Sequence, residues 1–213
     1  MSIVVEDDVV RIERFDLGLF GTNSYIVVCQ ATNDSVLIDA PADAKLLLGH
    51  LAETNPKYIL MTHNHFDHVG ALREIKSALG VPVAAHSYDA DGLPASTDIF
   101  IGDGDTLLVG KLELSILHTP GHTPGSLCFL VNSYLLSGDT IFPGGPGRTG
   151  TPSDFNQIVK SITSKVFILP EKTWIYPGHG EATILKREKD AFAHFSSQEH
   201  SPGLCGEVLW GSP

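Results

Sequence analysis

The order of apolar and polar positions predicts a chain that begins with strands and then alternates strands with helices. Its first third is rich in β-branched and aromatic residues in short runs between turn residues, a pattern typical of strands. Between Asp43 and Thr54 the apolar side chains recur at helical spacing, and Pro56 marks the end of that segment. We predict strands over residues 9–15, 24–30 and 36–39, a helix over 43–54 and a strand over 58–61.

The remainder of the chain continues this alternation. Apolar positions predict a helix over residues 72–79, capped by Gly80, and a strand over 81–85. Short apolar runs between glycine and asparagine residues favour an antiparallel meander over 99–136, and a loop follows at 143–147. The last predicted elements are a helix that begins after the N-cap residue Ser153, a strand over residues 173–176 and a helix over about 182–195.

The composition is that of an ordinary globular protein. The 213 residues are 42% hydrophobic and 18% charged, so the chain can bury one sizeable core. Residues 1–195 contain no linker or low-complexity break, and residues 196–213 are rich in Gly, Ser and Pro. We therefore expect one α+β domain over residues 1–195 and a C-terminal tail over residues 196–213.

The charge of the chain narrows the classes of partner and compartment. There are 14 Lys and Arg against 25 Asp and Glu, a formal charge of -11, which repels polyanions, so we expect no nucleic-acid partner. The first eight residues carry acid where a secretory leader carries base, and no apolar stretch reaches about 18 residues. We expect a cytoplasmic protein without a membrane anchor, whose three widely spaced cysteines stay reduced. The sequence does not define the oligomeric state.

The most informative motif directly follows the predicted strand over residues 58–61. The run Thr62-His63-Asn64-His65-Phe66-Asp67-His68 places four potential metal ligands within six residues. Side chains alternate along a strand and return every three or four residues along a helix, so neither element points all of these side chains one way. A loop can converge them, and we therefore predict a metal-binding loop at a strand end.

Three further ligand-type residues stand next to glycines, in segments that read as tight turns. They are His122 in Thr119-Pro-Gly-His-Thr-Pro-Gly125, Asp139 in Ser137-Gly-Asp-Thr140 and His179 in Tyr176-Pro-Gly-His-Gly180. Seven ligands are enough for two metal ions. Imidazole combined with carboxylate suits zinc, iron or manganese and not calcium. We expect two divalent ions, with zinc as the first choice and iron or manganese as alternatives.

The pattern His-x-His-x-Asp-His, followed by lone His122, Asp139 and His179, resembles the metallo-β-lactamase superfamily of metallohydrolases. The resemblance covers nearly the whole chain and implies a four-layer αββα sandwich with the site at one edge between two sheets, residues 1–195 being the catalytic domain. It also implies the ligand sets. His63, His65 and His122 would hold one metal, Asp67, His68 and His179 the other, and Asp139 would bridge them.

Within the superfamily, the stretch Gly138–Arg148 is similar to that of glyoxalase II, the hydroxyacylglutathione hydrolases, and the short chain is similar to single-domain members of that type. The resemblance implies hydrolysis of a small-molecule thioester by a metal-bound hydroxide, with Asp67 binding and orienting the metal that carries it. The chain has no obvious general acid, and a thiolate leaves unprotonated more easily than an amine. Arg148 and His86 are the candidates for contact with the substrate.

Two other functions stay open at this point. An Fe(II)-dependent persulfide dioxygenase needs one iron held by two histidines and a carboxylate, which His63, His122 and Asp139 can supply. A non-catalytic metal-binding protein, in which the ions contribute only folding energy, is the third hypothesis. The bridging carboxylate of Asp139 argues against a true β-lactamase.

Overall fold

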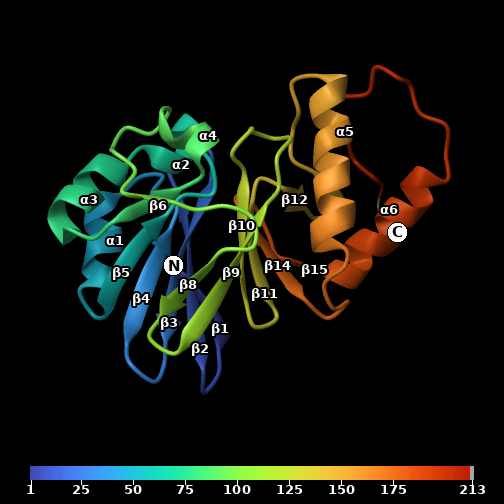
Figure 1. The fold of residues 1–213 in the computed structure, drawn as a ribbon. Helices are drawn as coiled ribbons and strands as arrows, with labels where there is room; N and C mark the ends of the chain where they lie inside the picture. Colours follow the sequence, from blue (N-terminus) through green and yellow to red (C-terminus); the bar gives the residue numbers. More distant parts are fainter. Residues whose placement is uncertain (212–213) are drawn as a thin grey trace.

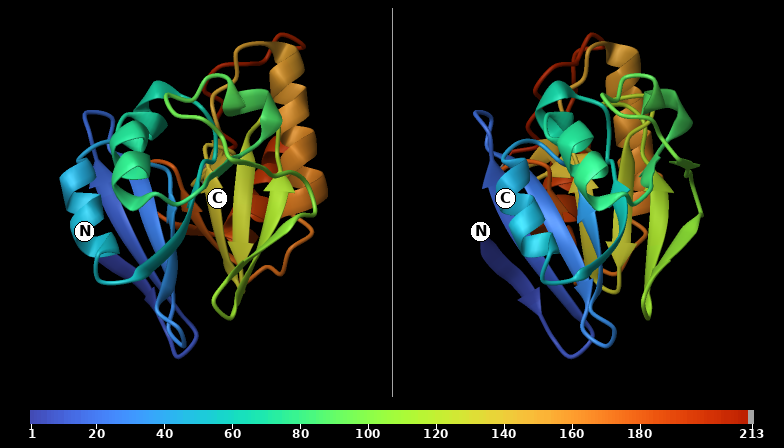
Figure 2. Two further views of the ribbon diagram at one scale, coloured as in Figure 1. Left: turned by 60° about the vertical axis from the view of Figure 1, so that its left-hand side comes forward. Right: turned by 90° about the vertical axis from the view of Figure 1, so that its left-hand side faces the viewer.

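The computed structural model describes residues 1–211, in which two β-sheets face each other and helices cover their outer faces (Figures 1 and 2). The first sheet has seven strands in sequence order. Its strands are β1 (Ser2–Glu6), β2 (Val10–Leu17), β3 (Thr22–Cys29), β4 (Asp34–Ile38), β5 (Asn55–Leu60), β6 (Val83–Ala85) and β7 (Ile99–Phe100).

The second sheet has six strands in the order β15-β14-β11-β10-β9-β8. They are β8 (Thr106–Val109), β9 (Leu112–His118), β10 (Leu127–Val131), β11 (Tyr134–Gly138), β14 (Trp174–Pro177) and β15 (Thr183–Ile184), and a separate hairpin pairs β12 (Ile141–Phe142) with β13 (Gly145–Pro146). The helices are α1 (Ala44–Leu51), α2 (Phe66–Val69), α3 (Leu72–Leu79), α4 (Ser87–Ala90), α5 (Pro152–Ser161), the π-helical continuation η1 (Ile162–Val166) and α6 (Leu185–Ser196).

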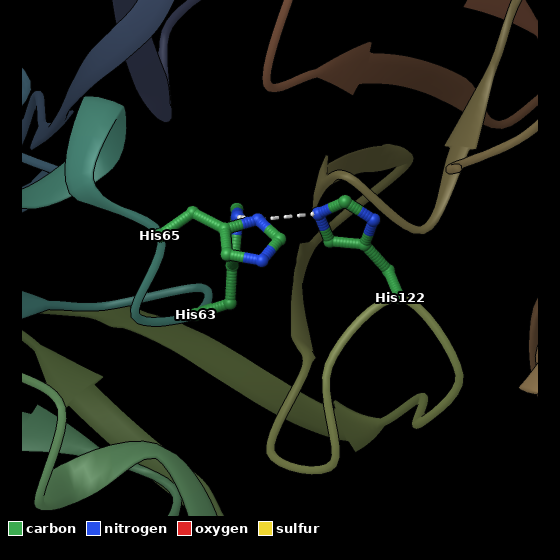
Figure 3. A group of neighbouring side chains, drawn as sticks. All are labelled: His63, His65 and His122. Carbon is green, nitrogen blue, oxygen red and sulfur yellow. Dashed lines mark hydrogen bonds between the residues drawn. The ribbon is translucent and has the colours of Figure 1, made fainter. Parts of the chain in front are cut away.

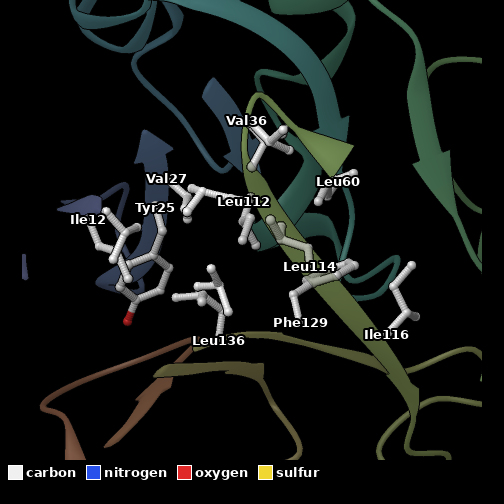
Figure 4. Packing of buried hydrophobic residues seen from close by; sticks show 14 of the residues in the cluster. Ile12, Tyr25, Val27, Val36, Leu60, Leu112, Leu114, Ile116, Phe129 and Leu136 are labelled. Carbon is white, nitrogen blue, oxygen red and sulfur yellow. The ribbon is translucent and has the colours of Figure 1, made fainter. Parts of the chain in front are cut away.

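Three buried clusters of apolar side chains hold these layers together. The central cluster packs residues of the first sheet such as Ile12 and Val27 against residues of the second such as Phe129 (Figure 4). A second cluster lies between the first sheet and helices α1 and α3, and a third lies between the second sheet and helices α5 and α6. All eight residues of β3 are buried, as expected for a strand covered on both faces. The expected α+β fold with αββα layers is confirmed.

The structure corrects the sequence prediction in several places. The N-cap of α5 is Thr151 and not Ser153, because the Thr151 hydroxyl accepts the Asp154 N–H. Strand β7, at the start of the predicted meander, pairs in parallel with β6 of the first sheet. The predicted helix over 182–195 begins later, because the β-branched Thr183 and Ile184 pair with β14 at the edge of the sheet. The predicted loop over 143–147 contains strand β13, since Gly144, with a φ of 85°, lets the chain turn back so that Gly145–Pro146 pair with Ile141–Phe142. None of the helices in residues 1–211 is long and apolar enough to cross a lipid bilayer.

Candidate metal centre

Parallel strand pairs in both sheets end at the same edge of the sandwich and bring distant segments together. In the first sheet β4 and β5 are parallel, so Asp39 after β4 lies beside the run 62–68 after β5. In the second sheet β11 and β14 are parallel, so Asp139 and His179 follow neighbouring strand ends. The loop between β9 and β10 carries His122 to the same place. All seven predicted ligands therefore gather at one edge, where carboxyl ends of parallel strands commonly form sites.

The first group of candidate ligands, here called the first site, consists of His63, His65 and His122. His65 Nδ1 lies 3.1 Å from His63 Nε2 and 2.9 Å from His122 Nε2. Figure 3 shows His63 and His65 arriving from one side and His122 from a loop on the other. Three imidazole nitrogens within 4.8 Å of one another form a cradle that a cation such as zinc can occupy.

The second site consists of Asp67, His68 and His179. His179 Nε2 lies 3.2 Å from Asp67 Oδ2 and 3.3 Å from His68 Nε2. Asp67 and His68 stand on the helical turn α2, which occupies the second half of the run that the sequence predicted as a loop. His65 is the N-cap residue of this turn, and the run thus supplies two candidate ligands to each site.

Asp139 lies between the two sites. Its Oδ2 is 3.4 Å from His122 Nε2 of the first site and 3.6 Å from His179 Nε2 of the second, while its Oδ1 is 3.5 Å from His68 Nε2. The Oδ1 atom is buried and has no hydrogen-bond donor among the described residues. A buried carboxylate oxygen without a donor, facing imidazole nitrogens, fits a metal ion as its missing partner.

Glycine permits the close approach of the two sheets at this point. A Cβ atom on Gly178 would overlap the Asp139 carboxylate and come within 2.8 Å of the His68 ring. Glycine at position 178 thus allows the backbone before His179 to lie directly against the other candidate ligands.

Hydrogen bonds on the outer nitrogens fix the orientation of four histidine rings. Two rings contact backbone carbonyls: His122 Nδ1 lies 2.8 Å from the Arg148 oxygen, and His179 Nδ1 lies 3.2 Å from the Phe20 oxygen. The other two contact side chains: His63 Nδ1 lies 3.0 Å from Thr62 Oγ1, and His68 Nδ1 lies 2.7 Å from Asp39 Oδ2. A ring that donates its Nδ1 proton to a carbonyl or carboxylate keeps the lone pair on Nε2 for a metal. The Nε2 atoms of all four rings point into the centre.

Asp39 is a functional residue that the sequence interpretation missed. Its carboxylate is buried, and besides His68 it accepts the backbone N–H of Thr62 at 2.8 Å and the Thr62 hydroxyl at 2.6 Å. Asp39 adopts a φ of 57°, which turns the chain at the end of β4. The signal for it was an aspartate placed directly after the apolar residues 36–38, beside the parallel strand that leads to the histidines.

The sequence profile of the metallo-beta-lactamase superfamily matches residues 17–179, a span that ends at the last candidate ligand. The chain belongs to this superfamily. The resemblance inferred from the ligand pattern is confirmed.

Two relatives carry the name of a thioester hydrolase. Hydroxyacylglutathione hydrolase of Pelagibacter ubique is 40% identical over 162 residues, which cover 73% of this chain and 65% of that protein. Hydroxyacylglutathione hydrolase GloC of Haemophilus influenzae is 32% identical over 204 residues, which cover 84% of this chain and 95% of that protein. This superfamily member thus spans about two thirds of the first relative and nearly the whole of the second.

Solved structures of similar chains share the fold. The B3 metallo-beta-lactamase BLEG-1 has a TM-score of 0.75 and 30% identity, over 84% of this chain and 96% of that one. TTHA1623, solved in a di-iron-bound form, has a TM-score of 0.70 and 29% identity, over 83% of this chain and 96% of that one. The superfamily binds divalent metals, and the centre of this member has the donor atoms to do so.

The electrostatics of the centre differ from ligand to ligand. Burial lowers the pKa of His63 well below its usual value and also lowers that of His65, so both rings are neutral at pH 7. Burial opposes the charged form of His68 as well, but the Asp39 and Asp139 carboxylates outweigh it and raise the pKa of His68 to about 10. Burial favours the protonated form of Asp139, yet His68 and the other histidines hold its pKa well below the usual range. The carboxylate is therefore ionised, the form a cation needs.

The two predicted substrate contacts lie in different surroundings. Arg148 is exposed and lines a cavity of about 300 Å³ together with His122, Asp139 and His179. His86 is not part of either site. Its ring stacks on His118 at a centroid distance of 3.9 Å, and its Nδ1 accepts the backbone N–H of Tyr88, which caps α4. Of the two, Arg148 is the one that the structure brings beside the centre.

Proposed function

We propose that this protein is a dinuclear metallohydrolase that cleaves a thioester of the hydroxyacylglutathione type. The observation that carries the proposal is the position of Asp139, whose two oxygens lie within 3.6 Å of imidazole nitrogens from both sites. A carboxylate shared in this way supports two adjacent cations acting on one substrate. The two relatives named as hydroxyacylglutathione hydrolases support the choice of a thioester.

We assign the seven ligands as the resemblance implies, with three residues on each ion and Asp139 between them. Two divalent ions bound there would supply a reactive water near neutral pH and polarise the substrate carbonyl. Zinc is our first choice because imidazole and carboxylate donors suit it. Iron is the alternative, and the di-iron-bound structural relative supports it.

Asp67 is the residue to which we assign a catalytic role. Its Oδ2 faces His179 Nε2 at 3.2 Å and also accepts the Thr22 hydroxyl at 3.3 Å. The carboxylate is thereby oriented from the protein side, and we assign it to bind and orient the ion that would carry the hydroxide. Thr22 itself is buried at the start of β3, so this orientation is fixed by the sheet.

The chemistry of the leaving group agrees with a thioester. Water adds to the acyl carbon, the C–S bond breaks, and the products are a carboxylic acid and a thiol. Because a thiol has a pKa near ~8.5, the thiolate departs without a proton donor far more easily than an alkoxide or an amine. Apart from the candidate ligand Asp139, Glu207 is the one acidic residue that lines this cavity in the described part of the chain.

Metal analysis together with thiol release tests this function. Protein purified without added metal is analysed for bound ions, stripped, reloaded with zinc or iron and assayed with S-lactoylglutathione. We expect two ions per chain and thiol release that disappears on stripping and returns on reloading.

A single tightly held iron with oxygen uptake on glutathione persulfide would overturn the proposal in favour of the dioxygenase. Two bound zinc ions with no hydrolysis of thioesters or lactones would favour a non-catalytic metal-binding protein.

A further inference from the structure

The chain beyond α6 returns to the metal centre and is tied down there. Thr149 and Gly206 exchange two backbone hydrogen bonds, of 3.1 and 3.0 Å, and the Trp210 N–H donates to the Gly144 carbonyl at 2.7 Å. Figure 1 shows this segment, in red, looping from the end of α6 over toward α5. Residues 205–210, here called the C-terminal strap, therefore lie along the loop that joins Asp139 to Arg148.

Side chains of the strap alternate between the protein interior and the solvent. Val208 and Trp210 are buried, and the Trp210 ring lies 4.8 Å from the Phe192 ring and 5.8 Å from the Phe167 ring. Leu209 between them is 75% exposed. A terminal segment anchored by a buried tryptophan and by backbone hydrogen bonds holds a fixed position, so the outward residues Glu207 and Leu209 are fixed as well.

Residues of the strap line a cavity beside the metal centre. Three candidate ligands, His122, Asp139 and His179, line this cavity of about 300 Å³, and so do Glu207, Val208 and Leu209 of the strap. Phe142, Pro143 and Pro146 of the β12–β13 hairpin line it as well. Apart from the ligands, the charged lining residues are Arg148 and Glu207, and the other lining residues carry no polar side chain, so most of the cavity wall away from the ligands is apolar.

We infer that the C-terminal strap is the specificity wall of the substrate pocket, with Leu209 and Phe142 binding an apolar acyl group of the thioester. The inference rests on the proposed function. The apolar group leaves water as it enters, and the adjoining ligands place the thioester carbonyl at the centre. Because the strap stands beside the ligands without belonging to them, it controls which acyl group is accepted and leaves the chemistry unchanged.

A pair of thioesters with one thiol and two acyl chains tests the inference. S-acetyl- and S-hexanoyl-N-acetylcysteamine are compared as substrates of the metal-loaded protein and of its Leu209→Asp variant. We expect the native protein to prefer the hexanoyl thioester at least about tenfold in kcat/KM, since a few methylenes in an apolar pocket have that effect. Leu209→Asp lowers kcat/KM for the hexanoyl thioester about tenfold and lowers that for the acetyl thioester by a smaller factor, so the acyl preference itself falls. Ile168→Asp, at an equally exposed position after η1, leaves both values unchanged.

Binding of a thioether provides a readout that does not need hydrolysis. The ligand is S-hexyl-N-acetylcysteamine, which has no thioester bond to cleave. Calorimetric titration should show about a tenfold higher Kd for Leu209→Asp than for the native protein, and an unchanged Kd for Ile168→Asp. If hydrolysis is intact but neither the acyl preference nor the thioether affinity depends on Leu209, the strap inference is wrong and the proposed function stands. If the thioether binds in a Leu209-dependent way but no thioester is cleaved, the proposed function is wrong and the pocket assignment stands.

Discussion

The two candidate sites draw on the same short run of sequence but are supported in different ways. In the second site the ring of His68 is fully buried and its Nδ1 lies 2.7 Å from the buried carboxylate of Asp39, to which it donates a hydrogen bond. In the first site His65 is exposed, and the outer nitrogen of His122 is held by a backbone carbonyl, that of Arg148. Buried carboxylates also serve the first site, but one step further away, since Asp39 reaches His63 only through the Thr62 hydroxyl. Asp89 accepts the Thr123 hydroxyl at 2.6 Å and the Gly125 N–H at 2.9 Å, and so holds the loop that carries His122.

This difference indicates which ligand rings are held firmly in one orientation and which are held less firmly. A charged carboxylate that binds a ligand directly determines the tautomer of that ligand and its orientation together. A carboxylate that holds only the loop determines position, and the orientation of the His122 ring depends instead on a neutral acceptor, the Arg148 carbonyl. We therefore expect the second site to depend strongly on its supporting aspartate and the first site to depend on its own only moderately.

The largest expected effect comes from the residue common to both sites. Asp139→Ala removes the carboxylate that faces both sites, so the metal content should fall at both and kcat should fall by more than about 100-fold, beyond the effect of a supporting residue. Mass spectrometric metal analysis and circular dichroism measure the occupancy and the fold. His122→Ala is the matched control, because it removes a ligand of the first site alone. If Asp139→Ala keeps two ions per chain, the bridging assignment is wrong.

The next largest effect is expected at Asp39, which supports the two sites unequally. Asp39→Asn replaces an acceptor beside His68 Nδ1 with an amide that can present a donor, which favours the tautomer with its proton on Nε2. We expect metal affinity at the second site to fall about 10–100-fold, and affinity at the first site to fall less, because Asp39 reaches His63 only through the Thr62 hydroxyl. Competition with a chromophoric chelator gives the two dissociation constants separately. Equal weakening of both sites would show that Asp39 supports the whole edge of the sheet and not His68 in particular.

A smaller effect is expected at Asp89, the counterpart of Asp39. In Asp89→Asn the remaining carbonyl can accept the Gly125 N–H, and the Thr123 hydroxyl can turn toward Ser126 Oγ, which lies 2.7 Å away. Since hydroxyl groups reorient to suit their partners, we expect the first site to lose only about threefold to tenfold in metal affinity. The same chelator competition checks this. A loss as large as that of Asp39→Asn would remove the distinction between direct and indirect support.

The sequence allowed much of the fold and the gathering of the candidate ligands to be predicted, and the reasons lie in particular residues. The run 62–68 follows an apolar strand, and each of the later ligands stands beside a glycine, so local pattern was sufficient to find them. Helices α1 and α3 were predicted because their apolar residues recur on one face, toward the sheet.

The remaining features depend on contacts between segments far apart in the chain. The role of Asp39 becomes visible only when β4 and β5 pair in parallel, and that of Asp89 only when α4 meets the loop after β9. The burial of Trp210 depends on Phe167 and Phe192, two aromatic residues from different segments that no local periodicity connects to it. A short segment rich in glycine and serine has no pattern of its own that reveals such packing.

The smallest expected effect concerns the Thr22 hydroxyl, which supports Asp67 of the second site, whereas Asp39 supports His68. Thr22 Oγ1 donates to Asp67 Oδ2 across 3.3 Å, a long hydrogen bond, and Thr22→Val removes it with little change of shape. One hydrogen bond of this kind contributes about 0.5–1.5 kcal/mol, so the second site should bind its metal about twofold to tenfold more weakly. Because Asp67 keeps its own contact with His179, the effect should stay well below that of Asp39→Asn. If Thr22→Val matches Asp39→Asn, the second site is governed by the orientation of Asp67 and not by the tautomer of His68.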